Sequence, residues 1–178
     1  MNYRKVLGCL LCILHFWGIG YSQDNIRANY GCADIEGIVL GAHPSLEQMK
    51  KCFGENYTAE HIIVDEVGPY DLMVYKFEGV ELSIDSGKGL ISFVLKSNKY
   101  HSLISYGIDD GVTVGDLWDV FLNAGYPIHS MYESNINDKD EKKYNLFFWM
   151  NGILPDTIVT MTVKNDIIIE IYVWPNDA

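Results

Sequence analysis

The chain has 178 residues, of which 24 are acidic and 13 are basic, so its formal net charge at pH 7 is −11. This excess of negative charge argues against nucleic acids and anionic membrane surfaces as partners, because like charges repel one another at long range. It permits a basic protein partner, although solubility alone also accounts for it.

The first 22 residues have the three parts of a signal peptide. Arg4 and Lys5 make the start basic, Val6–Ile19 is largely apolar, and small residues follow. A membrane span needs about 20 apolar residues, and this segment has only 14. We therefore expect residues 1–22 to be removed by cleavage between Ser22 and Gln23. The product is predicted to be an exported protein, periplasmic or secreted, that is soluble and has no membrane span.

A second interpretation of the N-terminus concerns Cys9. Val6–Cys9 resembles a lipoprotein cleavage box, which would place a lipid on that cysteine. However, almost no apolar segment precedes Cys9 and a long one follows it, so the peptidase would have to cut ahead of its own recognition core. We therefore expect no lipid at Cys9.

Residues 23–178 form the predicted mature chain, and their number is typical of a single domain. Two of the four cysteines leave with the signal peptide, and Cys32 and Cys52 remain. Two cysteines in an exported chain most often form one disulfide. The loop closed would have about 20 residues, worth roughly 3 kcal/mol in the chain-entropy model. No second ligand lies close in sequence to either cysteine, which argues against a metal site.

A glycine pattern occurs twice in the mature chain. Both Gly37–Gly54 and Gly107–Gly125 read Gly-Ile-x-x-Gly, then a short apolar-periodic segment, then glycine. The offset is 70 residues at the first glycine and 71 at the last. Self-similarity at a fixed period indicates repeated structural units. We therefore predict repeat one over about 36–104 and repeat two over about 105–174.

Each copy contains a short predicted helix that a glycine ends. Ser45 and Gln48 form a capping box in the first copy, and Thr113 and Asp116 resemble the same cap in the second. Neither helix is long enough to be stable without a sheet to pack against. The apolar residues at helical spacing are Leu46, Met49 and Phe53 in the first copy, and Leu117, Phe121 and Ala124 in the second.

Four strands are predicted after each helix, from apolar alternation and the turn residues between the strands. Asp85–Gly89 is interpreted as a hairpin turn, because a phosphate-binding loop would need an upstream glycine and a following helix. The predicted strands are Ile62–Glu66, Tyr70–Phe77, Val80–Ile84 and Leu90–Lys96 in the first copy, and Ile128–Tyr132, Tyr144–Met150, Thr157–Val163 and Ile167–Trp174 in the second.

These elements predict an α+β fold. Two tandem repeats, each a helix with a four-stranded antiparallel sheet, would join into one curved sheet with both helices on one face. The run Gly111–Thr113, with Leu117, Phe121 and Gly125–Pro127, resembles the helix motif of the SmpA/OmlA-type envelope lipoproteins. Two such units in tandem resemble the β-lactamase inhibitory protein family. That resemblance implies a concave eight-stranded sheet that grips a partner protein.

No motif for catalysis, a metal or a cofactor is found. The histidines of the mature chain are isolated in sequence, and no Gly-x-Ser-x-Gly is present. The acidic segment 135–141 has a lysine where a calcium loop needs a ligand, and it lacks the glycine of such a loop. We therefore predict a non-enzymatic protein with no cofactor and no metal.

Aromatic residues gather on one predicted face of the last strands. Alternation places on this face Phe147, Trp149, Tyr172 and Trp174. The opposite face, predicted to meet the helices, carries Leu146, Phe148, Met150, Val159, Met161, Val163, Ile167, Ile169, Ile171 and Val173. Aromatic residues interleaved with polar ones suit a binding surface. Two alternatives stay open: the N-terminal segment covers this face, or the strands simply pair their aromatic residues across the sheet.

The sequence thus predicts an exported, non-enzymatic module that binds a protein partner through its aromatic sheet face. One alternative is an assembly or structural factor of the cell envelope, by analogy with the lipoproteins. Another is a periplasmic immunity protein, whose acidity would complement a basic toxin.

Overall fold

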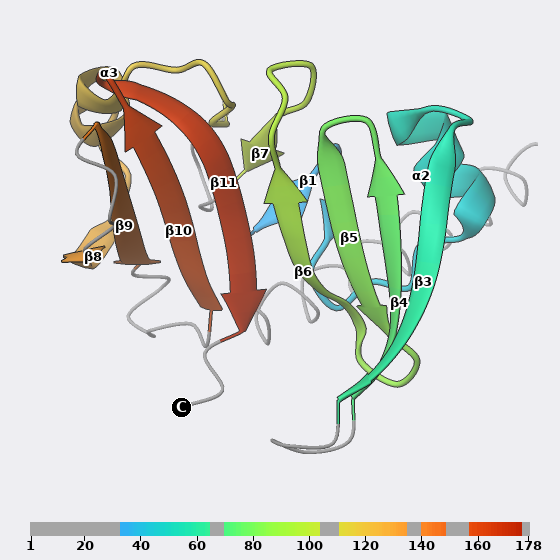
Figure 1. The fold of residues 1–178 in the computed structure, drawn as a ribbon. Coiled ribbons are helices and arrows are strands. Elements are labelled where there is room, and N and C mark those ends of the chain that lie inside the picture. The colour runs from blue at the N-terminus through green and yellow to red at the C-terminus, as the bar shows by residue number, and fades with distance from the viewer. Residues whose placement is uncertain (1–32, 65–69, 104–110, 135–139, 149–156, 176–178) are drawn as a thin grey trace, which may run out of the picture.

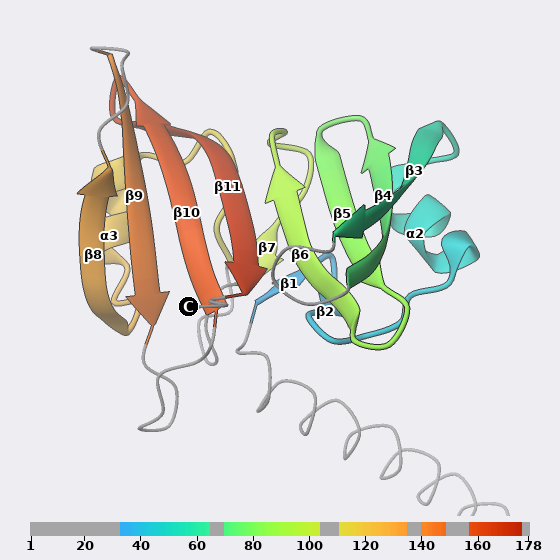
Figure 2. The same ribbon diagram turned by 60° about the horizontal axis from the view of Figure 1, so that its bottom comes forward.

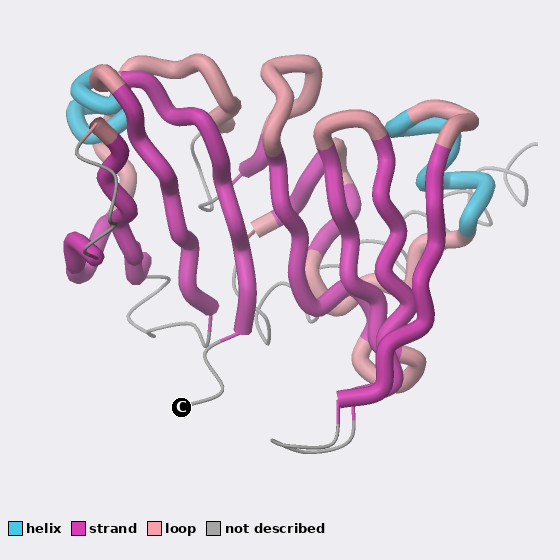
Figure 3. The backbone as a smooth tube through the Cα atoms, viewed as in Figure 1, coloured by secondary structure: helices cyan, strands magenta, loops and turns pink. Residues whose placement is uncertain are grey.

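A computed structural model describes residues 33–64, 70–103, 111–134, 140–148 and 157–175. Strands dominate these residues, as Figure 3 shows. The helices are α2 (Leu46–Phe53) and α3 (Trp118–Asn123). The strands are β1 (Asp34–Ile35), β2 (Ile38–Val39), β3 (Tyr57–Val64), β4 (Tyr70–Phe77), β5 (Val80–Asp85), β6 (Gly89–Leu95), β7 (Ser102–Leu103), β8 (Ile128–Ser134), β9 (Glu141–Phe148), β10 (Thr157–Lys164) and β11 (Ile167–Pro175).

The strands form two sheets. The large sheet has eight strands in the order β3-β4-β5-β6-β11-β10-β9-β8, and every neighbouring pair is antiparallel. The small sheet has the order β2-β1-β7. In Figures 1 and 2 the small sheet and both helices lie behind the large sheet, on the same side of it.

The predicted strands of the large sheet are all present, with ends that differ by a few residues. β4 has the predicted bounds, and β3 begins five residues earlier than expected, at Tyr57. The hairpin turn predicted at Asp85–Gly89 is confirmed, because Asp85 and Gly89 are the last paired residues of β5 and β6. Period-two alternation of apolar residues is therefore enough to locate these strands.

The core lies between the large sheet and the elements behind it. Side chains that are at most 8% exposed alternate along the strands and meet the helices and the small sheet. The sheet contributes, among others, Leu82, Phe93, Leu95, Tyr144, Leu146, Phe148, Val159, Met161, Ile171 and Val173, and the covering elements contribute Ile35, Ile38, Leu40, Met49, Phe53, Trp118 and Phe121.

Helix α2 has the predicted start. The Ser45 hydroxyl oxygen accepts a hydrogen bond from the Gln48 backbone N–H at 3.1 Å, and Gly54 follows the last turn with a positive φ of 101°. The helix buries Met49 and Phe53, and the Phe53 ring packs against Phe77 at a centroid distance of 5.4 Å. Burial of one face thus holds an eight-residue helix that would not be stable in isolation.

Helix α3 differs from its prediction. It starts at Trp118 rather than after Thr113, and Leu117 precedes it without a side-chain cap. The Thr113 N–H does donate to the Asp116 carboxylate at 2.8 Å, so the cap motif closes a turn instead of a helix. Gly115 N–H donates to the Ile168 carbonyl at 2.8 Å. Backbone bonds with the β10–β11 hairpin therefore replace the first predicted helical turn.

The α+β tandem-repeat fold predicted from the sequence is wrong. The described residues are mostly β, with one large and one small sheet, and their two helices have eight and six residues. Strand pairing also occupies the segment of the second predicted helix: Val112, which precedes the predicted cap, bridges to Ser102, and Leu117, which was expected in the helix, bridges to Ile167. In the described part of the glycine pattern, Gly37 and Gly41 lie in turns beside β2, and Gly54 and Gly125 follow the two helices. The pattern does not mark repeats of a helix-plus-sheet unit.

The face assignments of Ile167 and Ile169 on β11 are also wrong. The register shifts between Thr162 and Val163, so Val163 lies opposite Ile168. Ile168 is fully buried, whereas Ile167 is 39% exposed and Ile169 is half-buried. A β-bulge inserts one extra residue, and this moves the residues beyond it to the other face.

Among the described residues, no helix is long and apolar enough to cross a membrane.

Candidate functional site

The front face of the large sheet is covered by no described element. Figures 1 and 2 show the strands of this face in front, with the helices and the small sheet behind them. We call this front surface the outer face. Its centre is formed by the neighbouring strands β5, β6, β11 and β10. An antiparallel sheet can leave one face to solvent in this way.

Three of the four aromatic residues predicted as binding residues lie on the outer face. Phe147, Tyr172 and Trp174 are half-buried, and each alternates with core residues of its own strand. Trp149, and Met150, which was predicted to face the core, lie outside the described residues. Ile158 on β10 pairs with Trp174 on β11 and is 7% exposed. An apolar side chain of β10 therefore lies next to the aromatic residues of β11.

The aromatic residues of the outer face form two ring pairs. Tyr172 and Trp174 are two residues apart on β11, and their rings stack at a centroid distance of 6.0 Å and an interplanar angle of 16°. Tyr132 on β8 meets Phe147 on β9 edge to face, also at 6.0 Å. Tyr132 is 61% exposed and had not been predicted as a binding residue. Its position in an alternating strand next to the strand of Phe147 could have indicated that Tyr132 belongs to the same aromatic face.

A chain of hydrogen bonds that runs through four strands, from β11 to β8, holds Trp174 in place. The indole Nε1–H of Trp174 donates to the Thr160 hydroxyl oxygen at 3.0 Å. The Thr160 hydroxyl donates to Asn145 Oδ1 at 2.8 Å, and Asn145 Nδ2 donates to the Ser134 hydroxyl at 3.0 Å. Thr160 is only 3% exposed. These polar side chains therefore fix the orientation of the Trp174 ring.

Tyr172 is the residue where the aromatic and acidic parts of the outer face meet. Burial raises the pKa of the Tyr172 hydroxyl; a hydrogen bond with the Ser92 side chain opposes this, and the Glu81 carboxylate adds to the increase. In the sheet register Glu81 lies opposite Val94, and Val94 lies opposite Tyr172. The outer face therefore carries a carboxylate two strands away from the stacked rings.

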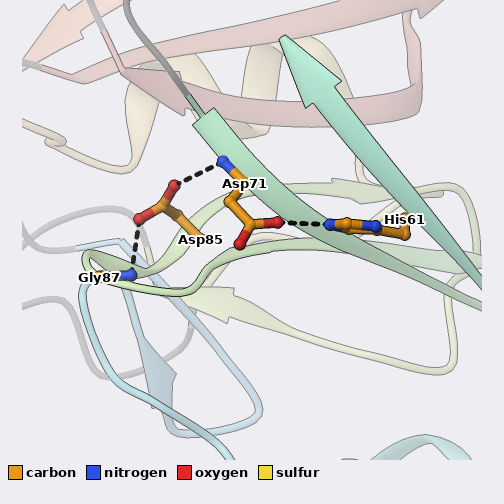
Figure 4. Close-up of polar contacts among 4 residues, drawn as sticks. All are labelled: His61, Asp71, Asp85 and Gly87. Atoms are coloured by element: carbon orange, nitrogen blue, oxygen red, sulfur yellow. Dashed lines mark hydrogen bonds and ion pairs between the residues drawn. The ribbon is translucent and has the colours of Figure 1, made fainter.

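The other face of the sheet carries a separate polar cluster near its β3 edge. Figure 4 shows Asp71 between His61 and Asp85: its carboxylate contacts His61 Nε2, and its backbone N–H donates to Asp85 Oδ2 at 3.3 Å. The His61–Asp71 pair was not predicted, because the two residues lie on different strands and form no motif in the sequence. His61 and Asp71 also line a shallow pocket of about 460 Å³. The pocket is lined by Pro44, His61, Asp71, Met73, Tyr75, Ile84 and Ser86.

The His61–Asp71 pair lies at the surface of the protein. The side chains of His61 and Asp71 are 54% and 59% exposed, so solvent screens their interaction. Within the described part of the chain, no hydrogen bond joins the Ser86 hydroxyl to His61, although a serine nucleophile needs such a base. The pair is best explained as a surface contact between neighbouring strands.

Asp85 has a structural role in its turn. Its Oδ1 accepts the backbone N–H groups of Gly87 at 2.9 Å and Lys88 at 2.8 Å. Burial raises the pKa of the Asp85 carboxyl, but the hydrogen bonds from the Lys88, Gly87 and Asp71 amides outweigh it and hold that pKa below its ordinary value. The carboxylate therefore closes the hairpin that the sequence predicted.

The predicted disulfide and the predicted cleavage site involve residues of the N-terminal segment. Cys32, Ser22 and Gln23 lie outside the described residues, and so does most of the acidic segment 135–141. Cys52 is half-buried on α2 and forms no disulfide with a described residue. The described residues also contain no group of three histidine, cysteine or acidic side chains that could hold a metal ion.

Comparisons with known proteins give little further information. No family model matches the chain, and no curated protein matches it. A solved structure from Streptococcus mutans, described as a putative β-lactamase inhibitor protein, matches with 14% identity and a TM-score of 0.28. The match covers 82% of this chain and 90% of that one. A likeness at this TM-score carries no argument about fold or function, so no family is assigned to this chain.

Proposed function

We propose that this protein is an exported, non-enzymatic module that binds a protein partner through the outer face of its large sheet. Phe147, Tyr172 and Trp174 are the proposed anchors, and Trp149 is proposed to extend the same surface. The export part of the proposal depends on the predicted signal peptide at residues 1–22.

One observation carries the proposal: the outer face presents aromatic rings that are half-exposed and already held in position. Tyr172 and Trp174 stack on each other, and the indole N–H of Trp174 is hydrogen-bonded to Thr160. Large aromatic side chains dominate the binding energy of protein interfaces, and rings that are already ordered lose less entropy on binding. A surface built only for solubility would not need such an arrangement.

Site-specific photo-crosslinking in the exporting cell tests this proposal. A photoreactive amino acid replaces Phe147 on the outer face, and a matched control places it at Val120, which is 61% exposed on α3 behind the sheet. We expect the Phe147 position to crosslink one defined protein, and the Val120 position to give no crosslink to that protein. Mass spectrometry identifies the partner, which is then purified for binding measurements.

The purified partner allows a quantitative test. Loss of an aromatic anchor costs about 2 kcal/mol or more in binding, so we expect Trp174→Ala to weaken affinity by roughly 30-fold or more. Val120→Ala should change the affinity by less than about twofold. Equal crosslinking at both positions, or equal effects of both substitutions, would refute the outer face as the binding surface.

Salt separates this mode of binding from simple charge attraction. An affinity dominated by aromatic burial should change little between low and high ionic strength, whereas one dominated by long-range charge should fall steeply. A steep fall would favour a basic toxin neutralised by an acidic immunity protein over the aromatic-anchor mode.

A further inference from the structure

We propose that the outer face contains a subsite for an arginine side chain of the partner, formed by the Glu81 carboxylate and the stacked rings of Tyr172 and Trp174. The inference rests on the proposed function, because it names the chemistry that the same surface would recognise. It adds a residue, Glu81, that had no assigned role.

Glu81 projects onto the outer face beside the aromatic residues. Its neighbours Val80 and Leu82 are buried in the core, so alternation directs Glu81 to the opposite side. The register places Glu81, Val94 and Tyr172 in one row across β5, β6 and β11. Two strand spacings amount to about 10 Å between the outer members of this row. Side chains of this length span that distance, and the effect of Glu81 on the Tyr172 pKa agrees with their proximity.

The Glu81 carboxylate has no cationic partner within the described part of the chain. Lys76 faces Glu81 in the register, but its ammonium lies 3.5 Å from a carboxylate oxygen of Glu60. Lys96, the nearest lysine beyond β6, lies 3.3 Å from Glu170. Glu81 is nevertheless only partly exposed. A half-buried carboxylate without a partner is best compensated by a cation from another molecule.

The rings define which cation fits. Tyr172 and Trp174 present nearly parallel planes, with an interplanar angle of 16°. A guanidinium is planar, stacks on aromatic rings and donates hydrogen bonds in a fixed fork to a carboxylate. An ammonium is a compact, strongly hydrated charge without that geometry. The combination of rings and a carboxylate therefore favours arginine over lysine. The net charge of −11 also favours the approach of a basic segment.

A peptide titration tests the subsite directly. The probe is a capped pentapeptide with one arginine between glycines, and its matched control has citrulline, a neutral isostere, in place of the arginine. Binding to the purified protein is followed by NMR through the Trp174 indole N–H and the β5 and β11 amides. We expect the arginine peptide to shift these signals and the citrulline peptide to bind at least tenfold more weakly. This comparison needs no altered protein.

Two substitutions then locate the carboxylate. Glu81→Gln should weaken the arginine peptide by about tenfold, while Glu78→Gln should change its affinity by less than twofold. Glu78 is a suitable control, because it is exposed, sits three residues away and forms an ion pair with Lys99. Equal shifts from both peptides would show that the charge of the guanidinium is not recognised, and equal weakening by both substitutions would leave only diffuse attraction by net charge. Either result overturns the subsite.

The two proposals fail in different ways. If Phe147 crosslinks a partner whose affinity is unchanged by Glu81→Gln, the arginine subsite is wrong and the binding face stands. If no crosslink forms at Phe147, the proposed function fails whatever the peptide result.

Discussion

Phe147 and Phe148 are neighbours on β9 that point to opposite faces of the large sheet. Phe148 is 3% exposed in the core, and Phe147 is half-buried on the outer face beside Tyr132. Truncating a buried phenylalanine removes its packing and leaves a cavity, so Phe148→Ala should cost about 3–5 kcal/mol in free energy of unfolding. Phe147→Ala should cost about 1 kcal/mol or less, the size of a single aromatic pair contact.

Thermal unfolding of the two variants measures this difference. For a domain of this size, 1 kcal/mol corresponds to a shift of about 2–4 °C in Tm. Phe148→Ala should therefore lower Tm several times more than Phe147→Ala. The reverse order would mean that the faces of β9 are exchanged, and equal large losses would mean that the outer face is covered.

Thr160 joins the hydrogen bonds of the outer face, because it accepts from Trp174 and donates to Asn145. Thr160→Val keeps the shape of the side chain but leaves both partners without that bond. Each unsatisfied buried group costs about 1–3 kcal/mol, so we expect a loss of that order in urea unfolding. Thr58→Val is the control, because Thr58 is exposed on β3. A loss of stability no larger than that of Thr58→Val would show that the hydrogen bonds of Thr160 do not hold Trp174 in place.

The Asp85 carboxyl makes a prediction about pH. Its pKa in the folded protein lies below the ordinary value of 3.8. Stability contributed by this ionised group is thus fully present above pH 4 and is lost as pH falls through the folded pKa. We expect the urea concentration at half-unfolding to decrease as the pH is lowered below 4. In this pH range the midpoint of Asp85→Asn should depend less on pH. Identical pH profiles for the two proteins would show that Asp85 does not contribute.

At the scale of the element, α2 is where the predicted disulfide would attach the N-terminal segment. Burial raises the pKa of the Cys52 thiol, and so does the Glu36 carboxylate, while Lys51 opposes them. A thiol with a raised pKa reacts slowly, so thiol labelling must be done on denatured, non-reduced protein. We expect no label on Cys32 or Cys52 in exported protein, and two labels after reduction. Two labels before reduction would disprove the disulfide.

The elements also show where the sequence was informative. Alternation located the strands of the large sheet, and Ser45 located the start of α2, because these signals depend on residues close in sequence. The start of α3 was mistaken, because Gly115 and Trp118 bond to the β10–β11 hairpin, about 50 residues away in sequence. A local cap motif cannot reveal that distant partner.

The predicted signal peptide would place the whole protein outside the cytoplasm. We expect the intact mass of exported protein to correspond to a chain that begins at Gln23, without lipid. The same measurement on the cytoplasmic fraction, before export, should give the unprocessed chain and serves as the control. A diacylated Cys9 would replace the soluble product with a membrane-anchored one.

The net charge, the large-sheet strands and the hairpin at Asp85 follow from composition or from neighbouring residues, so they can be inferred without a structure. The pairing of residues across strands depends on the folded sheet. The tertiary structure moved Ile168 into the core through a bulge, brought His61 beside Asp71, and aligned Glu81 with Tyr172. The physical reason is that register and bulges follow from packing of the complete sheet, and a shift of one residue exchanges the faces of a strand.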